Sequence, residues 1–232
     1  MTLRIGSISL TQSQHRPFEA LSQRIARMRA DILLVSGFRT GLRGMMLRAG
    51  LDRQGLVYQT PSDTEPEVEA LILGSRCPFL QVDMPGDLED HQHRFLHVCI
   101  GDFHLIACDL SGHSSPCALG PYILTQAQGL RRDKLILFSR CSGSPQTTPE
   151  QSASSCPRTG DTLADELTRL GFVDAYKLHS RPRGIRLPQG ESPPFNALVT
   201  PALSPQLSRC FEENAPTDTH SQEVHTAVLK MG

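Results

Sequence analysis

Several features that mark common classes of protein are absent from this chain. Its 232 residues include no tryptophan and three tyrosines. The apolar runs, such as residues 32–35, are far shorter than the roughly 20 residues that a membrane-spanning helix needs. The N-terminus has no long apolar stretch of the kind found in secretory signals. We therefore expect a soluble, cytoplasmic protein that does not bind membranes.

Strong charge and regular cysteine spacing are also missing. The net charge is −1, so no strong field draws in a polyanion, which argues against non-specific DNA binding. The seven cysteines are odd in number and irregularly spaced, which argues against a disulfide framework and favours a reducing compartment. The sequence has no Gly-x-Ser-x-Gly elbow, phosphate-binding glycine loop or Cys-x-x-Cys site. These absences exclude several familiar enzyme classes.

The hydrophobic pattern predicts strands that alternate with amphipathic helices. Residues 3–10 alternate as in a strand, apolar residues recur at helical spacing between Phe18 and Met28, and residues 32–35 form a buried strand. This order predicts an α/β unit with the two strands side by side. Gly101-Asp102, between the apolar runs 95–100 and 103–108, predicts a hairpin.

The rest of the chain continues the pattern. The other predicted strands are 70–73, 135–138, 173–175, 197–200 and 226–229, and the other predicted helices are 41–49, 122–130 and one that begins at Asp161 or Thr162. Three segments rich in turn-forming residues are predicted long loops: 142–160, 180–194 and 204–221. We expect residues 1–232 to form a single domain.

Five segments resemble the landmarks of a known enzyme family in order and spacing. They are RIGSISL from Arg4, ADILLVSGFR from Ala30, ALILGSRCP from Ala70, KLILFSRCS from Lys134 and SQEVHTAV from Ser221. They resemble the endonuclease/exonuclease/phosphatase family, to which DNase I and the neutral sphingomyelinases belong. With two weaker segments, the resemblance runs from residue 3 to about residue 229. It implies a four-layer α/β/β/α sandwich of two mixed β-sheets flanked by helices.

The positions that carry the chemistry of this family hold other residues here. Ser9 stands where the family has an asparagine that helps to hold metal and phosphate, and Ser36-Gly37 stands where it has Gln-Glu. That glutamate is a principal metal ligand of the family, and glycine has no side chain to replace it. Asp109 takes the place of a histidine that contacts phosphate.

The later landmarks differ in the same way. Arg140 and Ser142 replace the catalytic aspartate and asparagine of a Gly-Asp-Phe-Asn motif, and Asn196 aligns with the aspartate that orients the catalytic histidine. Gln222-Glu223 replaces the C-terminal Asp-His pair that carries the general base. The resemblance therefore implies the family scaffold without its catalyst, and we expect neither a catalytic metal nor a cofactor.

These replacements predict a catalytically inactive protein, a pseudoenzyme that acts by binding a partner in a regulatory role. A protein is the favoured partner and RNA is the second. The alternatives are a divergent metal-dependent phosphodiesterase, nuclease or phosphatase with a rebuilt site, and a structural subunit of a larger assembly. The eight replaced positions are the candidate binding residues: Ser9, Gly37, Asp109, Arg140, Ser142, Asn196, Gln222 and Glu223.

A few further residues have both a functional and a structural interpretation. Arg140 has the charge of a phosphate clamp, but a surface arginine at a strand end is favoured. His91 and His93 have a spacing that permits metal binding in an extended segment, although a solvated loop is favoured. His97 and Cys99 share a strand face, where core packing is the ordinary role of a cysteine.

Cys141 and two groups of basic residues also have both a functional and a structural interpretation. Cys141 beside an arginine is typical of a reactive thiol, yet no suitable histidine follows it, so we interpret it as a chance cysteine. The basic groups 131–134 and 181–186 form either an RNA or anionic-partner patch or, as we favour, solvated faces and loops.

Overall fold

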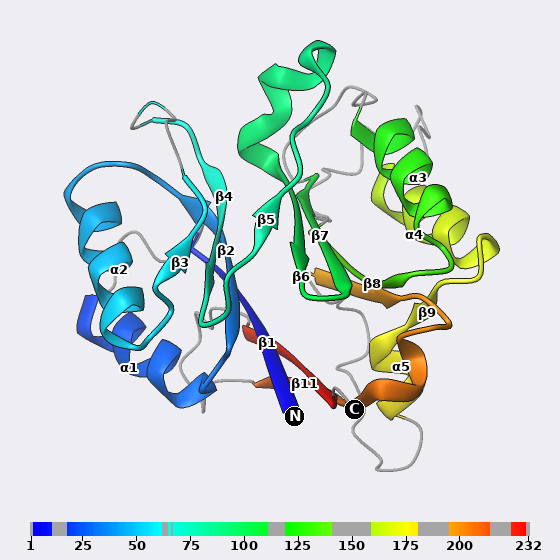
Figure 1. Cartoon of the computed structure of the whole chain (residues 1–232). Coiled ribbons are helices and arrows are strands. Elements are labelled where there is room, and N and C mark those ends of the chain that lie inside the picture. Colours follow the sequence, from blue (N-terminus) through cyan, green and yellow to red (C-terminus); the bar gives the residue numbers. More distant parts are fainter. Residues whose placement is uncertain are drawn as a thin grey trace, which may run out of the picture.

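The strands of the chain form two six-stranded sheets that pack face to face, with helices on the outside (Figure 1). The computed structural model describes residues 2–10, 18–61, 65, 67–110, 119–140, 159–180, 195–213 and 224–230. No helix within these ranges is both long enough and apolar enough to cross a membrane.

The first sheet has the strand order β11-β12-β1-β2-β4-β3. Its central strands β1 and β2 are parallel, and every other neighbouring pair is antiparallel. The predicted α/β unit at the start of the chain is therefore confirmed. The bounds of the strands are β1 Thr2–Ser9, β2 Ile32–Phe38, β3 Tyr58–Gln59, β4 Ala70–Ser75, β11 Leu207–Glu213 and β12 Val224–Lys230.

The second sheet repeats this plan, with the order β5-β6-β7-β8-β10-β9. Here β7 and β8 are the parallel pair, and the predicted hairpin joins β6 to β7. Ile100 pairs with Phe103 across a two-residue turn whose first residue, Gly101, has a φ of 60°, as a type II′ turn requires. The bounds are β5 Leu80–Gln81, β6 Phe95–Ile100, β7 Phe103–Asp109, β8 Lys134–Arg140, β9 Val173–Asp174 and β10 Phe195–Val199.

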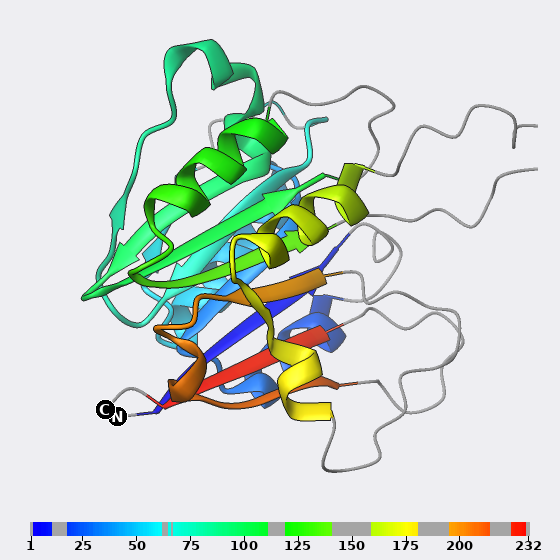
Figure 2. The same cartoon turned by 90° about the vertical axis from the view of Figure 1, so that its right-hand side faces the viewer.

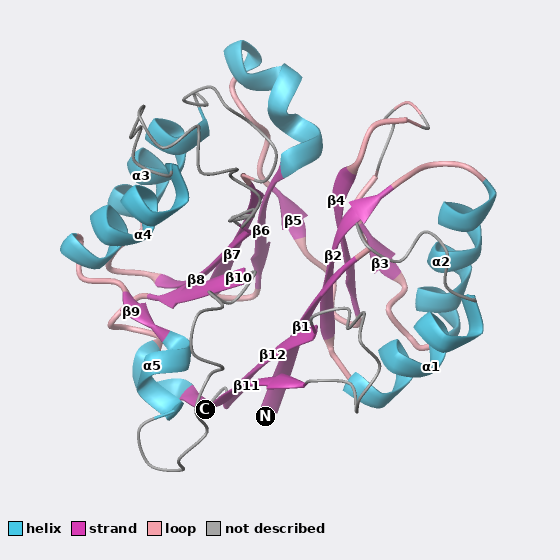
Figure 3. Ribbon diagram, turned by 180° about the vertical axis from the view of Figure 1, so that it is seen from behind, coloured by secondary structure: helices cyan, strands magenta, loops and turns pink. Residues whose placement is uncertain are grey.

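Helices complete the outer layers, as Figure 3 shows from behind. α1 and α2 cover the first sheet, and α3 and α4 cover the second. The predicted four-layer α/β/β/α sandwich is therefore confirmed. The helices are α1 Phe18–Met28, α2 Leu42–Arg53, α3 Leu119–Gly129, α4 Thr159–Arg169 and α5 Ala175–Ser180, with short 3₁₀ helices η1 Gly86–Arg94 and η3 Ser204–Gln206.

Alternation along the central strands distributes apolar side chains among three cores. On β2, Leu34 joins the cluster between the sheets, whereas Leu33 joins the cluster beneath α1 and α2. On β7, Leu105 faces the other sheet and Ile106 packs beneath α3 and α4. Because successive strand residues point to opposite faces, strands covered on both sides are apolar at nearly every position. This explains the continuous apolar runs in the sequence.

Some predicted boundaries were wrong. Residues 204–221 are not a loop throughout, because 204–206 form η3 and 207–213 form the edge strand β11. An edge strand is held by backbone hydrogen bonds to one neighbour and tolerates charged residues, so its sequence has no strong hydrophobic pattern. Ala175 begins α5 instead of ending a strand, and α4 begins at Thr159 within the predicted loop 142–160. Residues 142–158 and 181–194 lie outside the described residues.

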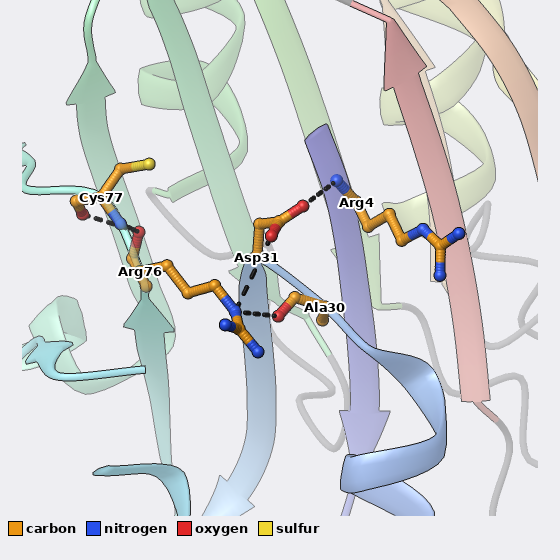
Figure 4. A network of polar contacts seen from close by, with 6 residues as sticks. Arg4, Ala30, Asp31, Arg76 and Cys77 are labelled. Atoms are coloured by element: carbon orange, nitrogen blue, oxygen red, sulfur yellow. Dashed lines mark hydrogen bonds and ion pairs between the residues drawn. The ribbon is translucent and has the colours of Figure 1, made fainter. Parts of the chain in front are cut away.

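The segment ALILGSRCP forms β4 and the turn that follows it. Asp31 accepts a hydrogen bond from the backbone N–H of Arg4 at 2.9 Å and lies 3.7 Å from Nε of Arg76 (Figure 4). The hydroxyl of Ser75 donates to the carbonyl of Cys77 at 2.7 Å and accepts from its N–H at 3.0 Å. These contacts join the starts of β1 and β2 to the end of β4.

Candidate functional site

The candidate site lies at the carboxyl ends of the two parallel strand pairs. In the first sheet the register pairs Ser9 with Ser36, and the backbone N–H of Leu10 donates to the carbonyl of Ser36 at 2.9 Å. The antiparallel β12 begins beside them, with Val224 opposite Ile8. The landmarks at the two ends of the sequence are therefore brought together by strand pairing.

The corresponding strand ends of the second sheet lie on the same side of the molecule. In Figure 2 the orange strand β10 and the red strand β12 begin on one side. Since β10 is antiparallel to β8 and β12 is antiparallel to β1, the carboxyl ends of β1 and β8 lie on that side as well. Residues from both sheets can therefore contribute to one site.

Gly37 lies in a bulge near the end of β2. The pairing with β4 shifts between Val35 and Phe38, so that two residues on β2 face one on β4. Gly37 has a φ of 71°, in the left-handed region that favours glycine. A glutamate here would meet backbone strain as well as supply a carboxylate.

Asp109 and Arg140 form an ion pair at the ends of β7 and β8. The parallel register places the two residues opposite each other, and Nη1 of Arg140 donates to Oδ2 of Asp109 at 3.0 Å. Their side chains are 11% and 13% exposed for Arg140 and Asp109, respectively. The N–H of Leu110 also donates to the carbonyl of Arg140 at 2.8 Å. The two opposite charges therefore neutralise each other within the protein.

The sequence-based interpretation of Arg140 as a surface arginine was wrong. Arg140 is buried, because the register of the parallel strands brings Asp109 beside it. Ser9, Gly37, Asp109 and Arg140 all lie at or near strand ends. The backbone of Asn196, in β10, pairs with that of Ser139, in β8. Ser142, Gln222 and Glu223 lie outside the described residues.

Sequence reasoning missed two features near this site. Ser7 is fully buried, and its hydroxyl, like that of Ser36, has no hydrogen-bond partner among the described residues. The alternation Ile5, Ser7, Ser9 was a signal that could have placed Ser7 on the inward face. At the start of α2, Leu42 is 76% exposed, Met45 68% and Met46 39%. Their spacing places these three residues on one helix face.

The other candidates from the sequence lie elsewhere. His91 and His93 lie in η1, so the segment is a 3₁₀ helix and neither the loop that the sequence favoured nor the extended segment of the alternative. Arg131 and Arg132 are exposed, and Lys134 donates to Asp102 at 2.6 Å. Cys141 and residues 181–186 lie outside the described residues.

Comparisons with known proteins identify the fold. No family model matches the sequence. No curated protein matches it either. Among solved structures, an AP endonuclease from Archaeoglobus fulgidus is similar, with a TM-score of 0.66, 16% identity and coverage of 99% of this chain and 100% of that one. A 3′ phosphatase from Neisseria, bound to product DNA hairpin, has a TM-score of 0.70, 16% identity and coverage of 99% and 100%.

A third similar structure has the name of the family. It is an endonuclease/exonuclease/phosphatase from Beutenbergia cavernae, with a TM-score of 0.68, 16% identity and coverage of 100% of this chain and 72% of that one. This chain has the endonuclease/exonuclease/phosphatase fold. At such low identity, the likeness extends to the fold alone.

Among the described residues, those at the strand ends of this endonuclease/exonuclease/phosphatase fold are not the ligand set that a catalytic Mg²⁺ ion prefers. Mg²⁺ is held mainly by carboxylate oxygens and water. Gly37 offers no side-chain ligand atom, and the carboxylate of Asp109 is bound to the Arg140 guanidinium. A second cation beside this arginine would be repelled. The donor set of the described residues therefore differs from what the fold implies.

Proposed function

We propose that this protein is a non-catalytic representative of the endonuclease/exonuclease/phosphatase fold that binds a protein partner in a regulatory role. The observation that carries the proposal is the buried ion pair between Asp109 and Arg140. Hydrolysis by the metal mechanism needs a site where positive charge gathers around a phosphate and where a base activates water. Here the strand ends carry a carboxylate that is already neutralised.

Loss of a single catalytic group is easily offset by a neighbour, but the replacements involve groups with different tasks. By the sequence resemblance, Gly37 aligns with a metal ligand of the family, Arg140 with an acid and Asp109 with a phosphate-binding histidine. Residues of one catalytic unit act non-additively, so the removal of several leaves little for the others to do. This supports binding over catalysis as the use of the scaffold.

The exposed apolar face of α2 favours a protein partner over RNA. α2 begins at Leu42, shortly after the end of β2 at Phe38. Methionine side chains adapt to varied surfaces and are common where proteins bind other proteins. Leu42, Met45 and Met46 therefore present an apolar face close to the candidate site, on a chain with a net charge of −1. RNA binding would call instead for basic and aromatic residues.

The purified chain is expected to hydrolyse no phosphodiester or phosphomonoester above background in Mg²⁺ or Mn²⁺. Gly37→Glu is expected to remain inactive, because one carboxylate restores neither the general base nor the acid replaced by Arg140. The assay is turnover of single-stranded and double-stranded DNA, RNA and a chromogenic phosphodiester. Calorimetry should detect no Mg²⁺ site tighter than about 1 mM.

Gly37→Ala is the matched control for Gly37→Glu, since it adds a side chain at the positive φ without a carboxylate. Metal-dependent turnover by the unaltered chain would establish the alternative, a divergent phosphodiesterase or phosphatase. Turnover by Gly37→Glu but not by Gly37→Ala would show that the remaining catalytic groups are intact. Either result would contradict the proposal.

Met45→Glu is expected to weaken binding of the protein partner by about tenfold or more, which corresponds to about 1.4 kcal/mol. A charge on the exposed face of α2 would have to be desolvated in the complex. The partner is first recovered by affinity purification from the native host, with and without nuclease, then purified and titrated against each variant. The matched control is Leu80→Glu, because Leu80 on β5 is 75% exposed. Equal binding by both variants, or capture that nuclease abolishes, would contradict a protein partner at this face.

A further inference from the structure

Three side chains on the β6–β7 hairpin converge at a point away from the candidate site. The register places Cys99 opposite His104, and His97 lies two residues before Cys99 on the same strand face. Nε2 of His97 lies 3.0 Å from Nδ1 of His104, and Sγ of Cys99 lies 3.3 Å from the same Nδ1. The three atoms all lie within 4.8 Å of one another. They come from the face of the second sheet that packs under α3 and α4, to which Phe95 and Ile106 of the same strands also belong.

Hydrogen bonds within this cluster cannot satisfy all of its polar atoms. Nδ1 of His104 faces two heteroatoms but carries either one proton or one lone pair. His97 is 4% exposed, and its other ring nitrogen has no hydrogen-bond partner among the described residues. A cation between the three atoms would accept a lone pair from each of them. Buried polar groups that share too few protons are where an ion or a water is expected.

The ligand types and spacing are those of a zinc site. Zn²⁺ binds histidine nitrogen at about 2.0–2.1 Å and cysteine sulfur at about 2.3 Å in a tetrahedral arrangement. Ligand atoms around such an ion are therefore about 3.3–3.8 Å apart. Two of the three separations, 3.0 Å and 3.3 Å, need to widen by only a few tenths of an ångström, and the third, between His97 and Cys99, is within 4.8 Å. Two imidazoles and one thiolate are also ligands that Mg²⁺ does not favour.

A Zn²⁺ ion binds neutral imidazole and thiolate, so metal binding must release the proton of the Cys99 thiol to solvent. Cys99 and His104 are half-buried, which leaves the cluster accessible from outside.

We propose that His97, Cys99 and His104 form a zinc site with one open coordination position. Among the described residues, no fourth histidine, cysteine or acidic group joins these three. Three protein ligands with a fourth position left to water or another small ligand is the arrangement of reactive zinc sites, whereas structural sites have four protein ligands. His104 and Asp109 are both on β7 and lie roughly 17 Å apart along it at about 3.4 Å per residue. The zinc site is therefore separate from the strand-end site and does not depend on the proposed function.

The test uses the whole purified chain, stripped of metal with a chelator. Zn²⁺ added in competition with a chromophoric chelator should bind with a Kd below about 1 μM and one ion per chain. Co²⁺ in place of Zn²⁺ should give a thiolate-to-cobalt charge-transfer absorption and the d–d bands of tetrahedral coordination. Absence of submicromolar zinc binding, or a Co²⁺ complex without the thiolate band, would overturn the proposal.

Variants locate the site. Cys99→Ser and His104→Gln should each weaken Zn²⁺ binding by more than the roughly 10–100-fold that loss of an outer-shell partner costs. The matched controls Cys77→Ser and His91→Ala should bind Zn²⁺ like the unaltered chain. The melting temperature of each metal-free variant checks folding, and the Co²⁺ spectrum of the unaltered chain decides thiolate ligation if a variant unfolds. Tight zinc binding by folded Cys99→Ser and His104→Gln would place the metal elsewhere and refute the assignment.

Discussion

Arg140→Met is expected to lower the free energy of unfolding by about 3–5 kcal/mol, because it leaves the carboxylate of Asp109 buried without its counter-charge. The pair is 11% and 13% exposed, so water can replace little of the lost interaction. Asp109 lies at the end of β7, opposite Arg140 in the parallel register. Urea denaturation followed by circular dichroism measures the effect.

Two controls separate burial from charge in this experiment. In Asp109→Leu/Arg140→Met no charge remains unpaired, so the double variant should recover most of the lost stability, since apolar pairs replace buried ion pairs at little cost. Glu69→Ala breaks an exposed ion pair, in which Arg39 and Glu69 are 44% and 31% exposed, and should cost about 0–1 kcal/mol. A loss below about 1 kcal/mol for Arg140→Met would mean that Arg140 is solvated and free to receive a ligand.

The ion pair with Asp109 limits how far Arg140 can bind a ligand. An arginine that is held by a carboxylate in the interior contributes to the scaffold first. A phosphate or an acidic side chain would have to compete with Asp109 for the same guanidinium, at a distance of 3.0 Å. We therefore expect the binding surface to involve the exposed residues near the strand ends, above all those of α2, more than Arg140 itself.

Phe138→Ala is expected to cost about 3–5 kcal/mol, the range for truncating a buried phenylalanine to alanine. Phe138 is fully buried on β8, in the core between the two sheets and two residues before Arg140. Truncation leaves a cavity that two strand-paired sheets can close only in part, because their backbones are held by hydrogen bonds on both sides. For a protein of this size, the melting temperature should fall by roughly 6–20 °C.

Leu80→Ala is the matched control, because Leu80 also belongs to the second sheet but is 75% exposed. Its substitution should change the free energy of unfolding by no more than about 0.5 kcal/mol. If Phe138→Ala instead costs less than about 1.5 kcal/mol, the two sheets do not pack around this side chain. The expected difference between the two variants therefore tests the sandwich itself.

Local sequence patterns predicted most of the elements that build this fold. The apolar runs at 95–100 and 103–108, separated by Gly101-Asp102, became the hairpin β6–β7 with the expected two-residue turn. Edges were harder. β11 was missed because it is an edge strand whose hydrogen-bonded neighbour is β12, so its side chains need not alternate strictly between apolar and polar.

The contacts within the candidate site could not be predicted from the sequence. Ser9, Gly37, Asp109 and Arg140 were placed at strand ends because the landmark segments align in order with a known family. Their partners could not be read from that alignment. Arg140 was expected at the surface, whereas its position opposite Asp109 buries it. A residue's neighbours in a parallel pair depend on the register between distant segments, and single-strand periodicity does not specify that register.

The sequence by itself determined most of the segments that form strands and helices, and their order, because periodicity is a local property. The tertiary structure alone decided which residues meet. Strand pairing across 31 positions joins Asp109 to Arg140. The turn at Gly101 folds His104 back against His97 and Cys99. Contacts of this kind follow from register and sheet packing, which arise only when the whole chain has folded.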